Sequence, residues 1–230
     1  MRHLDCLVLL NKNMQFGKIG LLLGRELSSE LRSKEQLTGV LVQVCITLFL
    51  VYLSNPFLNE KYWNVFLWIC ILFNNIHAVG KGFLNQKPGL SLYFFQIASP
   101  TEIIVAKLIF NAIMGISLGI ISLFLMFFFF PNPSINILPL GLSTILFCWG
   151  TSALFTFSSS ISVGLRGANI IFPILSFPLS IPLLLITVKS GKRAFLLENI
   201  VWMSEHWLLF VVSLMISLFT IILFPFIWGE

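Results

Sequence analysis

Six long apolar stretches account for most of this 230-residue chain, and the polar connections between them are too short to hold a catalytic domain. A helix that spans a bilayer needs about 20 mostly apolar residues, because each residue rises only ~1.5 Å through a hydrocarbon core of ~30 Å. Charged residues make up 10% of the chain, whereas a soluble domain carries roughly 25%. The expected spans are Leu37–Leu53, Tyr62–Gly80, Ile103–Phe130, Ile137–Ser160, Ala168–Val188 and Trp207–Trp228.

These stretches predict an all-α polytopic membrane protein with six transmembrane helices. The chain lacks the alternating ten-residue pattern of an outer-membrane barrel, so helices are the expected spanning elements. Residues 1–19 are expected to form an N-terminal cytoplasmic tail, and residues 20–230 a single transmembrane permease domain. Met1 and Met14 are both candidate start residues.

The distribution of Lys and Arg predicts the orientation, because basic residues accumulate in short cytoplasmic connections. Six spans place both termini on one side of the membrane. That side carries ten basic residues: Arg2, Lys12, Lys18, Arg25, Arg32, Lys34, Lys81, Lys87, Lys107 and Arg166. The other side carries four: Lys61, Lys189, Lys192 and Arg193. Both termini are therefore expected in the cytoplasm, and the net charge of +5 reflects topology rather than nucleic-acid binding.

Residues Gly20–Gln36 are predicted to form an amphipathic helix on the cytoplasmic surface. Leu23, Leu27 and Leu31 repeat every four residues and give one apolar stripe. The rest of this helix is polar and includes Arg25, Glu26, Glu30 and Arg32. Such a helix is either a simple juxtamembrane anchor or an elbow helix that frames a docking surface.

The connection Lys81–Glu102 is the longest one on the cytoplasmic side. Pro88-Gly89 predicts a turn within it, and Ser99-Pro100 followed by Glu102 predicts the start of the third span. Aromatic residues, among them Phe83 and Tyr93, lie in this otherwise polar connection. They indicate either a partner surface or burial among lipid headgroups.

Within the spans, small residues and prolines are the main irregularities. Gly115-x-x-x-Gly119 predicts a close approach of two helix backbones. The serines at 158–160 and 162 are expected to bond back to their own helix or to a neighbour, with a polar path as the alternative. Pro173, Pro178 and Pro182 predict a bent fifth span, which serves either as a fixed wedge or as a hinge.

The connection Lys189–His206 is expected to be an outer loop. Its Trp202 and the following Trp207 are typical of an aromatic belt at the membrane interface. An alternative is that tryptophan and His206 together contact a planar ligand such as haem.

No motif for catalysis by this chain itself is found, so it is not expected to be an enzyme. It lacks the G-x-x-x-x-G-K-[ST] loop for nucleotides and the zinc-protease and nucleophile-elbow motifs. The three histidines, His3, His77 and His206, are too scattered to predict a metal or haem site. The spans are almost free of charge, and Lys107 is close enough to the cytoplasmic end to snorkel, which disfavours an ion-coupled carrier. The bundle is therefore expected to be the permease part of a transporter powered by a separate ATPase, with residues 81–102 as the coupling element.

Three segments resemble the CcmB family, the membrane subunit of the haem-exporter-type ABC complex in cytochrome c maturation. They are Arg25-Glu26-Leu27 with Glu30-Leu31-Arg32, Pro100-Thr101-Glu102-Ile103-Ile104-Val105-Ala106-Lys107, and Ser162-Val163-Gly164-Leu165-Arg166 with Leu175–Ile186. The resemblance runs from about Gly20 to the C-terminus. It implies an ABC-type permease bundle in the bacterial inner membrane, with an N-terminal elbow helix.

The resemblance also implies the partners. They are an ATP-binding subunit of the CcmA type, a haem-handling membrane subunit of the CcmC type, a small single-span subunit and a periplasmic haem chaperone of the CcmE type. ATP hydrolysis by the partner would release the haem-loaded chaperone, and haem would be handled by the complex without being bound directly by this chain. The alternatives are a membrane scaffold that never couples to an ATPase, and an ABC permease for lipids or drugs.

One segment departs from the family pattern. The family's connection before the third span is often acidic, whereas Gln86–Leu92 contains no carboxylate and keeps only Gly89 of the pattern. Contact with the ATPase would then depend on Phe83, Asn85, Gln86 and Tyr93.

Overall fold

The computed structural model describes residues 16–32, 34–54, 58–84, 99–131, 135–163, 168–195 and 204–228. These ranges contain seven helices and no strand. The helices are α2 (Phe16–Arg32), α3 (Lys34–Ser54), α4 (Glu60–Leu84), α6 (Pro100–Phe129), α7 (Ile137–Val163), α8 (Ala168–Phe195) and α9 (Ser204–Trp228). The predicted all-α class is confirmed for this part of the chain.

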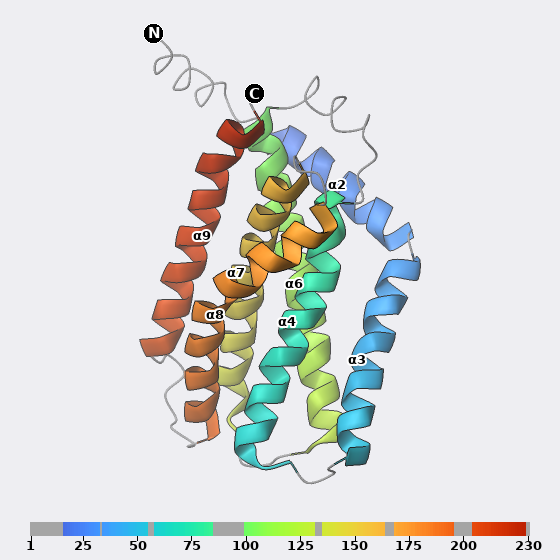
Figure 1. Ribbon diagram of the computed structural model, residues 1–230, viewed down its shortest axis with the longest axis vertical. Coiled ribbons are helices and arrows are strands. Elements are labelled where there is room, and N and C mark those ends of the chain that lie inside the picture. The colour runs from blue at the N-terminus through green and yellow to red at the C-terminus, as the bar shows by residue number, and fades with distance from the viewer. Residues whose placement is uncertain are drawn as a thin grey trace.

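The bundle has two distinct ends (Figure 1). Helix α2 lies across one of them, which we name the α2 end, and α9 finishes at this same end. Helices α4, α7 and α9 start at the opposite, far end, where α3, α6 and α8 finish. Helix α7 is central: it contacts α4, α6, α8 and α9, and 67% of its apolar stretch is buried within the protein.

Five helices are long and apolar enough to cross a membrane. Their spanning parts are Glu60–Val79, Pro100–Phe129, Ile137–Ser162, Ile170–Phe195 and Ser204–Phe226. In α3 the apolar part of the described region is Val42–Ser54, which rises only ~20 Å against a hydrocarbon core of ~30 Å. The first turn of α3 is the polar run Lys34-Glu35-Gln36. Helix length and composition therefore establish five of the six expected spans.

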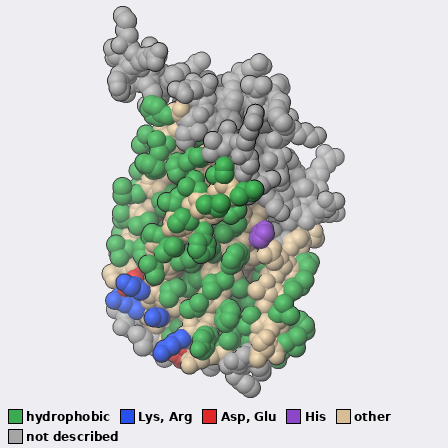
Figure 2. Space-filling model, viewed as in Figure 1, with side chains coloured by type: hydrophobic (Ala, Val, Ile, Leu, Met, Phe, Trp, Pro, Cys, Tyr) green, Lys and Arg blue, Asp and Glu red, His purple; other side chains and the backbone are tan. Residues whose placement is uncertain are grey.

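The surface of the bundle is apolar where it would meet lipid (Figure 2). On the face shown there, hydrophobic side chains cover the middle, and the visible basic and acidic groups lie near the far end. Large exposed side chains include Phe124, Phe128, Ile170, Ile174 and Met215. The interior, in contrast, holds many buried Asn, Ser and Thr side chains. An apolar exterior around a partly polar interior is the arrangement that a bilayer favours.

Helix α2 starts earlier and ends earlier than the predicted Gly20–Gln36. Phe16 and Ile19 continue the helical spacing of the apolar stripe toward the N-terminus, and this explains the earlier start. Ile19 is buried, Leu22 and Leu23 are half-buried, and Leu21 is exposed. The helix thus presents one apolar side to α6 and α3, which it contacts.

Candidate functional site: a polar-stapled helix bundle

The residues expected to contact an ATPase fall mostly outside the described ranges. Asn85, Gln86, Gly89 and Tyr93 lie in 85–98, which the structure does not describe, and so does the cytoplasmic residue Arg166. Phe83 was assigned to the connection, but it lies in α4, which continues to Leu84. Gly80, Gly82 and the alternation of apolar and polar residues concealed this extra turn in the sequence.

The exit from this connection into α6 is well defined. Ser99 accepts a hydrogen bond on its Oγ from the Glu102 backbone N–H at 3.4 Å, and its own N–H donates to Glu102 Oε2 at 2.9 Å. Pro100 occupies the first turn, where its missing N–H leaves no bond unmade. The predicted helix start is therefore confirmed as a capping box, which satisfies two backbone N–H groups at the start of α6.

Two of the four predicted elbow residues have described side chains, and one of them makes a cross-helix contact. Glu26 Oε1 lies 3.7 Å from Lys107 Nζ of α6. The side chain of Lys107 is only 3% exposed, so it does not snorkel to the surface as expected but lies buried beside α2. Arg25 is exposed. Glu30 and Arg32 belong to α2, but their side chains are outside the described part.

The three prolines of the fifth span lie within one continuous helix. Pro173, Pro178 and Pro182 are inside α8 and are exposed toward the surroundings of the bundle. Helix α8 changes direction along its length in Figure 1, as three interior prolines predict. Whether α8 acts as a wedge or as a hinge stays a prediction.

The far end of α8 is held by α4. Asn64 Nδ2 donates to the Val188 carbonyl at 2.9 Å, and Trp68 Nε1 donates to Asn64 Oδ1 at 2.7 Å. A Cβ at Gly191 would clash with Asn64 Oδ1, so only glycine lets the two helices approach here. The predicted outer loop Lys189–His206 is therefore wrong at both ends, because α8 continues to Phe195 and α9 begins at Ser204.

His206, in the first turn of α9, contacts two other helices at the far end. Its Nε2 lies 2.9 Å from Ser143 Oγ and 3.0 Å from the Pro139 carbonyl, both on α7, and 3.5 Å from Ser190 Oγ on α8. The two serine hydroxyls lie 2.5 Å apart. His206 is 0% exposed, so the idea that it meets a planar ligand at the surface is wrong. It joins α7, α8 and α9 instead.

An ion pair lies beside the His206 cluster. Arg193 of α8 donates from Nη1 to Glu205 Oε2 of α9 at 2.9 Å, and Ser204 Oγ donates to the same oxygen at 3.1 Å. Trp207 is 59% exposed, which agrees with the expected interfacial belt. Trp202 lies outside the described residues.

Close packing at the centre involves the two predicted glycines. A Cβ at Gly115 would come within 2.7 Å of Asn75 Oδ1 on α4, and one at Gly119 would clash with Cys148 Sγ on α7. The predicted close approach is thus confirmed, and α6 packs against α4 and α7 there. Three of the serines near the end of α7 donate to carbonyls of their own helix, as expected: Ser159, Ser160 and Ser162. The fourth, Ser158, departs from the prediction, because its buried hydroxyl has no hydrogen-bond partner in the described part of the protein.

Side-chain amides form hydrogen bonds between helices, and these bonds were not predicted from the sequence. Asn74 Nδ2 of α4 donates to Ser122 Oγ of α6 at 2.8 Å, and Asn75 Nδ2 donates to Thr151 Oγ1 of α7 at 3.1 Å. Asn111 Nδ2 of α6 donates to Thr156 Oγ1 of α7 at 2.8 Å. All of these groups are buried. A lone Asn in a long apolar stretch is the local signal, because such a group needs a partner inside the bundle.

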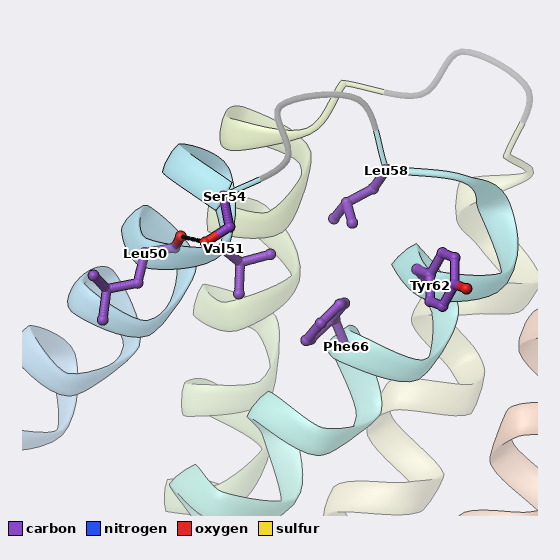
Figure 3. Close-up of a pocket in the computed structure, with 6 residues that line it drawn as sticks. All are labelled: Leu50, Val51, Ser54, Leu58, Tyr62 and Phe66. Carbon is purple, nitrogen blue, oxygen red and sulfur yellow. Dashed lines mark hydrogen bonds between the residues drawn. The ribbon is translucent and has the colours of Figure 1, made fainter.

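An open groove separates α3 from α4 at the far end (Figure 3). It encloses about 520 Å³ and is lined by Leu50, Val51, Ser54, Leu58, Tyr62 and Phe66. The Ser54 hydroxyl donates to the Leu50 carbonyl of its own helix at 2.9 Å, so the lining offers little unsatisfied polarity. The groove is suited to apolar contacts with lipid or with another helix.

Among the described residues, no group of three His, Cys, Asp or Glu side chains could hold a metal ion. The buried polar groups that join the described helices include amides, hydroxyls, the His206 imidazole and the Lys107 ammonium. This arrangement fixes the relative positions of helices.

Comparison with known proteins agrees with the all-helical membrane architecture. No curated protein and no solved structure matches the chain. The family model described as CcmB protein matches residues 18–229, which is nearly the entire sequence. The chain therefore belongs to the CcmB family.

Proposed function

We propose that this chain is the membrane subunit of an ABC-type complex for cytochrome c maturation, in the class of haem-export proteins. The observation that carries the proposal is the family match over residues 18–229, on a bundle with five long apolar helices. A separate ATP-binding subunit of the CcmA type would hydrolyse ATP. The bundle would use that energy to release the haem-loaded chaperone of the CcmE type, with a CcmC-type subunit and a small single-span subunit as further partners.

The same proposal includes a membrane topology. Helix α3 is a span in addition to the five long apolar helices and precedes them along the chain, and its polar first turns lie in the headgroup region beside the elbow helix α2. Both termini and the 85–98 connection lie in the cytoplasm of a bacterial cell, and the far end faces the periplasm. The four basic residues at the far end, against ten elsewhere, support this orientation.

The coupling role of the connection between α4 and α6 rests on its position. It lies between two helices that both contact the central α7, and its last residues enter α6 through the Ser99–Glu102 capping box. A displacement at Ser99 would therefore be passed on to the first turn of α6. Phe83, at the end of α4, and Asn85, Gln86, Gly89 and Tyr93 would provide the contact surface.

A detergent pull-down tests this function. The wild type is compared with a Phe83→Ala, Asn85→Ala, Tyr93→Ala variant and with a control, Lys61→Ala, Lys189→Ala, Lys192→Ala, whose exposed side chains lie at the far end. The ATP-binding subunit should be retained by the wild type and the control and lost by the first variant. A wild type that never captures an ATPase, yet holds a haem-handling membrane protein, would show a passive scaffold instead.

A further inference from the structure

Lys107 is a charged side chain in an apolar place. It is the eighth residue of α6, about 10 Å from the start of that helix at ~1.5 Å per residue. Its neighbours Ile104 and Leu108 are buried in an apolar cluster with Phe224 of α9. An ammonium group with 3% exposure is costly unless a counter-charge lies close to it.

Helix α2 supplies that counter-charge. The Glu26 carboxylate comes within 3.7 Å of the ammonium and is itself 31% exposed, so the pair lies at the border between the bundle and its surroundings. Helix α2 also makes apolar contact with the bundle, where Ile19 is buried. Apolar contact is not directional and lets a helix slide or rotate. A charge pair between two fixed positions selects one register of α2 on α6.

The pair between Lys107 and Glu26 lies close to the point where the 85–98 connection enters α6. The 85–98 connection enters α6 at the Ser99–Glu102 capping box, and Lys107 follows within two turns. Farther along α6, Gly115 and Gly119 pack against α4 and α7. A push on the connection would act on α6 through the capping box, and whatever is attached to α6 at Lys107 would move with it.

We infer that Lys107 and Glu26 are positioning residues that join α2 to α6, so that the elbow helix and α6 move as one unit when the ATP-binding partner acts on the 85–98 connection. The inference deepens the proposed function and rests on it for the last step. The contact itself can be tested alone.

The test is a charge swap in the full-length chain in lipid nanodiscs, followed by hydrogen exchange of the α2 amides. Lys107→Glu and Glu26→Lys place like charges together, and each should speed exchange in α2 at least ~10-fold. The double variant restores an opposite pair and should return exchange to within about twofold of wild type. Lys61→Glu, an exposed charge reversal at the far end of α4, is the control and should leave α2 unchanged.

If the charge-reversal variants fail to fold, Lys107→Met is a second variant with which to test the contact in a folded bundle. It removes the ammonium and preserves a chain of similar length, so no unpaired buried cation remains. Exchange in α2 should still rise, whereas exchange in α9 should not. The inference that Lys107 and Glu26 join α2 to α6 would be wrong if hydrogen exchange in α2 is unchanged in this variant. It would also be wrong if the charge swap restores neither folding nor the wild-type exchange rate.

A second measurement separates the joint from the function. ATP-dependent cytochrome c maturation in cells should fall in the single charge reversals and recover in the swap. If the single charge reversals speed hydrogen exchange in α2 but leave maturation unchanged, the contact between Lys107 and Glu26 exists but has no role in coupling. Failure of the proposed function itself would be visible independently, as a wild type that captures no ATP-binding subunit.

Discussion

Cys148 shows how tightly single residues determine the packing of this bundle. It is fully buried, its sulfur contacts α6 at Gly119, and its backbone carbonyl oxygen lies 3.5 Å from the position of a Cβ on Gly115. In the structure this thiol fills the space that a methyl group on α6 would need.

A double-mutant cycle tests this contact. Gly119→Ala should lower the free energy of unfolding by about 1–3 kcal/mol through overpacking, a loss of about 2–4 °C in Tm per kcal/mol. In a Cys148→Ala background the sulfur is gone, so the same change should cost at least ~1 kcal/mol less. Thermal denaturation in detergent gives the Tm of the wild type, the two single variants and the double variant.

Gly141→Ala is the matched control for that cycle. Gly141 lies on α7 and has open space around the position of a Cβ, so alanine should leave the Tm unchanged or raise it slightly. Equal Tm values for Gly119→Ala and Gly141→Ala would contradict the packing described.

At the scale of single residues, the sequence predicted that small residues allow two helices to approach closely. It did not predict which side chains of the other helices they contact. Gly115-x-x-x-Gly119 indicated a close approach, but nothing local pointed to Cys148 or Asn75 on the other side. Asn111 bonds to a threonine 45 residues away, and His206 to a proline carbonyl 67 residues away. Such pairs depend on how distant helices are placed in three dimensions, and hydropathy in a window does not contain that placement.

Helix α8 combines a rigid part and a deformable part. Its far end is held by Asn64, His206 and Glu205 from two other helices, and the backbone N–H of Asn136 donates to the Ala194 carbonyl at 3.1 Å. The prolines lie nearer the α2 end and are exposed. Each proline removes one backbone hydrogen bond from the helix. If α8 moves, the part before Pro182 should move and the part after Thr187 should stay in place.

Pro178→Ala tests the hinge at the level of the helix. Restoring a backbone hydrogen bond should keep or raise stability, while a stiffer α8 should reduce ATP-dependent cytochrome c maturation several-fold. Pro225→Ala is the control, since Pro225 is also inside a helix but lies near the end of α9. Full maturation with Pro178→Ala would favour a fixed wedge over a hinge.

The helices themselves were largely predictable from apolar length, and their ends were less so. The start of α6 was predicted through Ser99-Pro100 and Glu102 because a capping box is a local signal. The end of α8 was placed too early, because Lys189, Lys192 and Arg193 suggested a loop. Basic residues in the last turn instead suit the negative end of the helix dipole. Gly191 is set by contact with Asn64, which no local pattern reveals.

For the whole molecule, the arrangement of the ends restricts the possible topologies. Helix α2 and the last turn of α9 lie at one end, and the exposed Lys61 and Lys192 belong to helix ends at the other (Figure 1). Any membrane orientation must therefore place Lys61 and Lys192 together, on the side opposite α2. The family assignment was predictable from three motifs, whereas the packing of α4, α6, α8 and α9 around α7 was not.

Cysteine accessibility checks the orientation. In a background with the four native cysteines replaced by alanine, Lys61→Cys and Lys192→Cys should react with a membrane-impermeant maleimide in intact spheroplasts. Ser28→Cys, at an exposed position of α2, should react only after permeabilisation. The reverse pattern would place the α2 end outside and would invalidate the proposed topology.

The imidazole of His206 has a consequence for the order in which the protein is built. A ribosome delivers α7 and α8 to the membrane before α9 exists, so for a time Ser143 contacts Ser190 and the Pro139 carbonyl without the ring nitrogen of His206. Helix α9 supplies that nitrogen in its first turn, together with the carboxylate for Arg193. The polar contacts of this corner are therefore completed only when α9 reaches it, and a nascent chain halted before residue 204 would lack both groups.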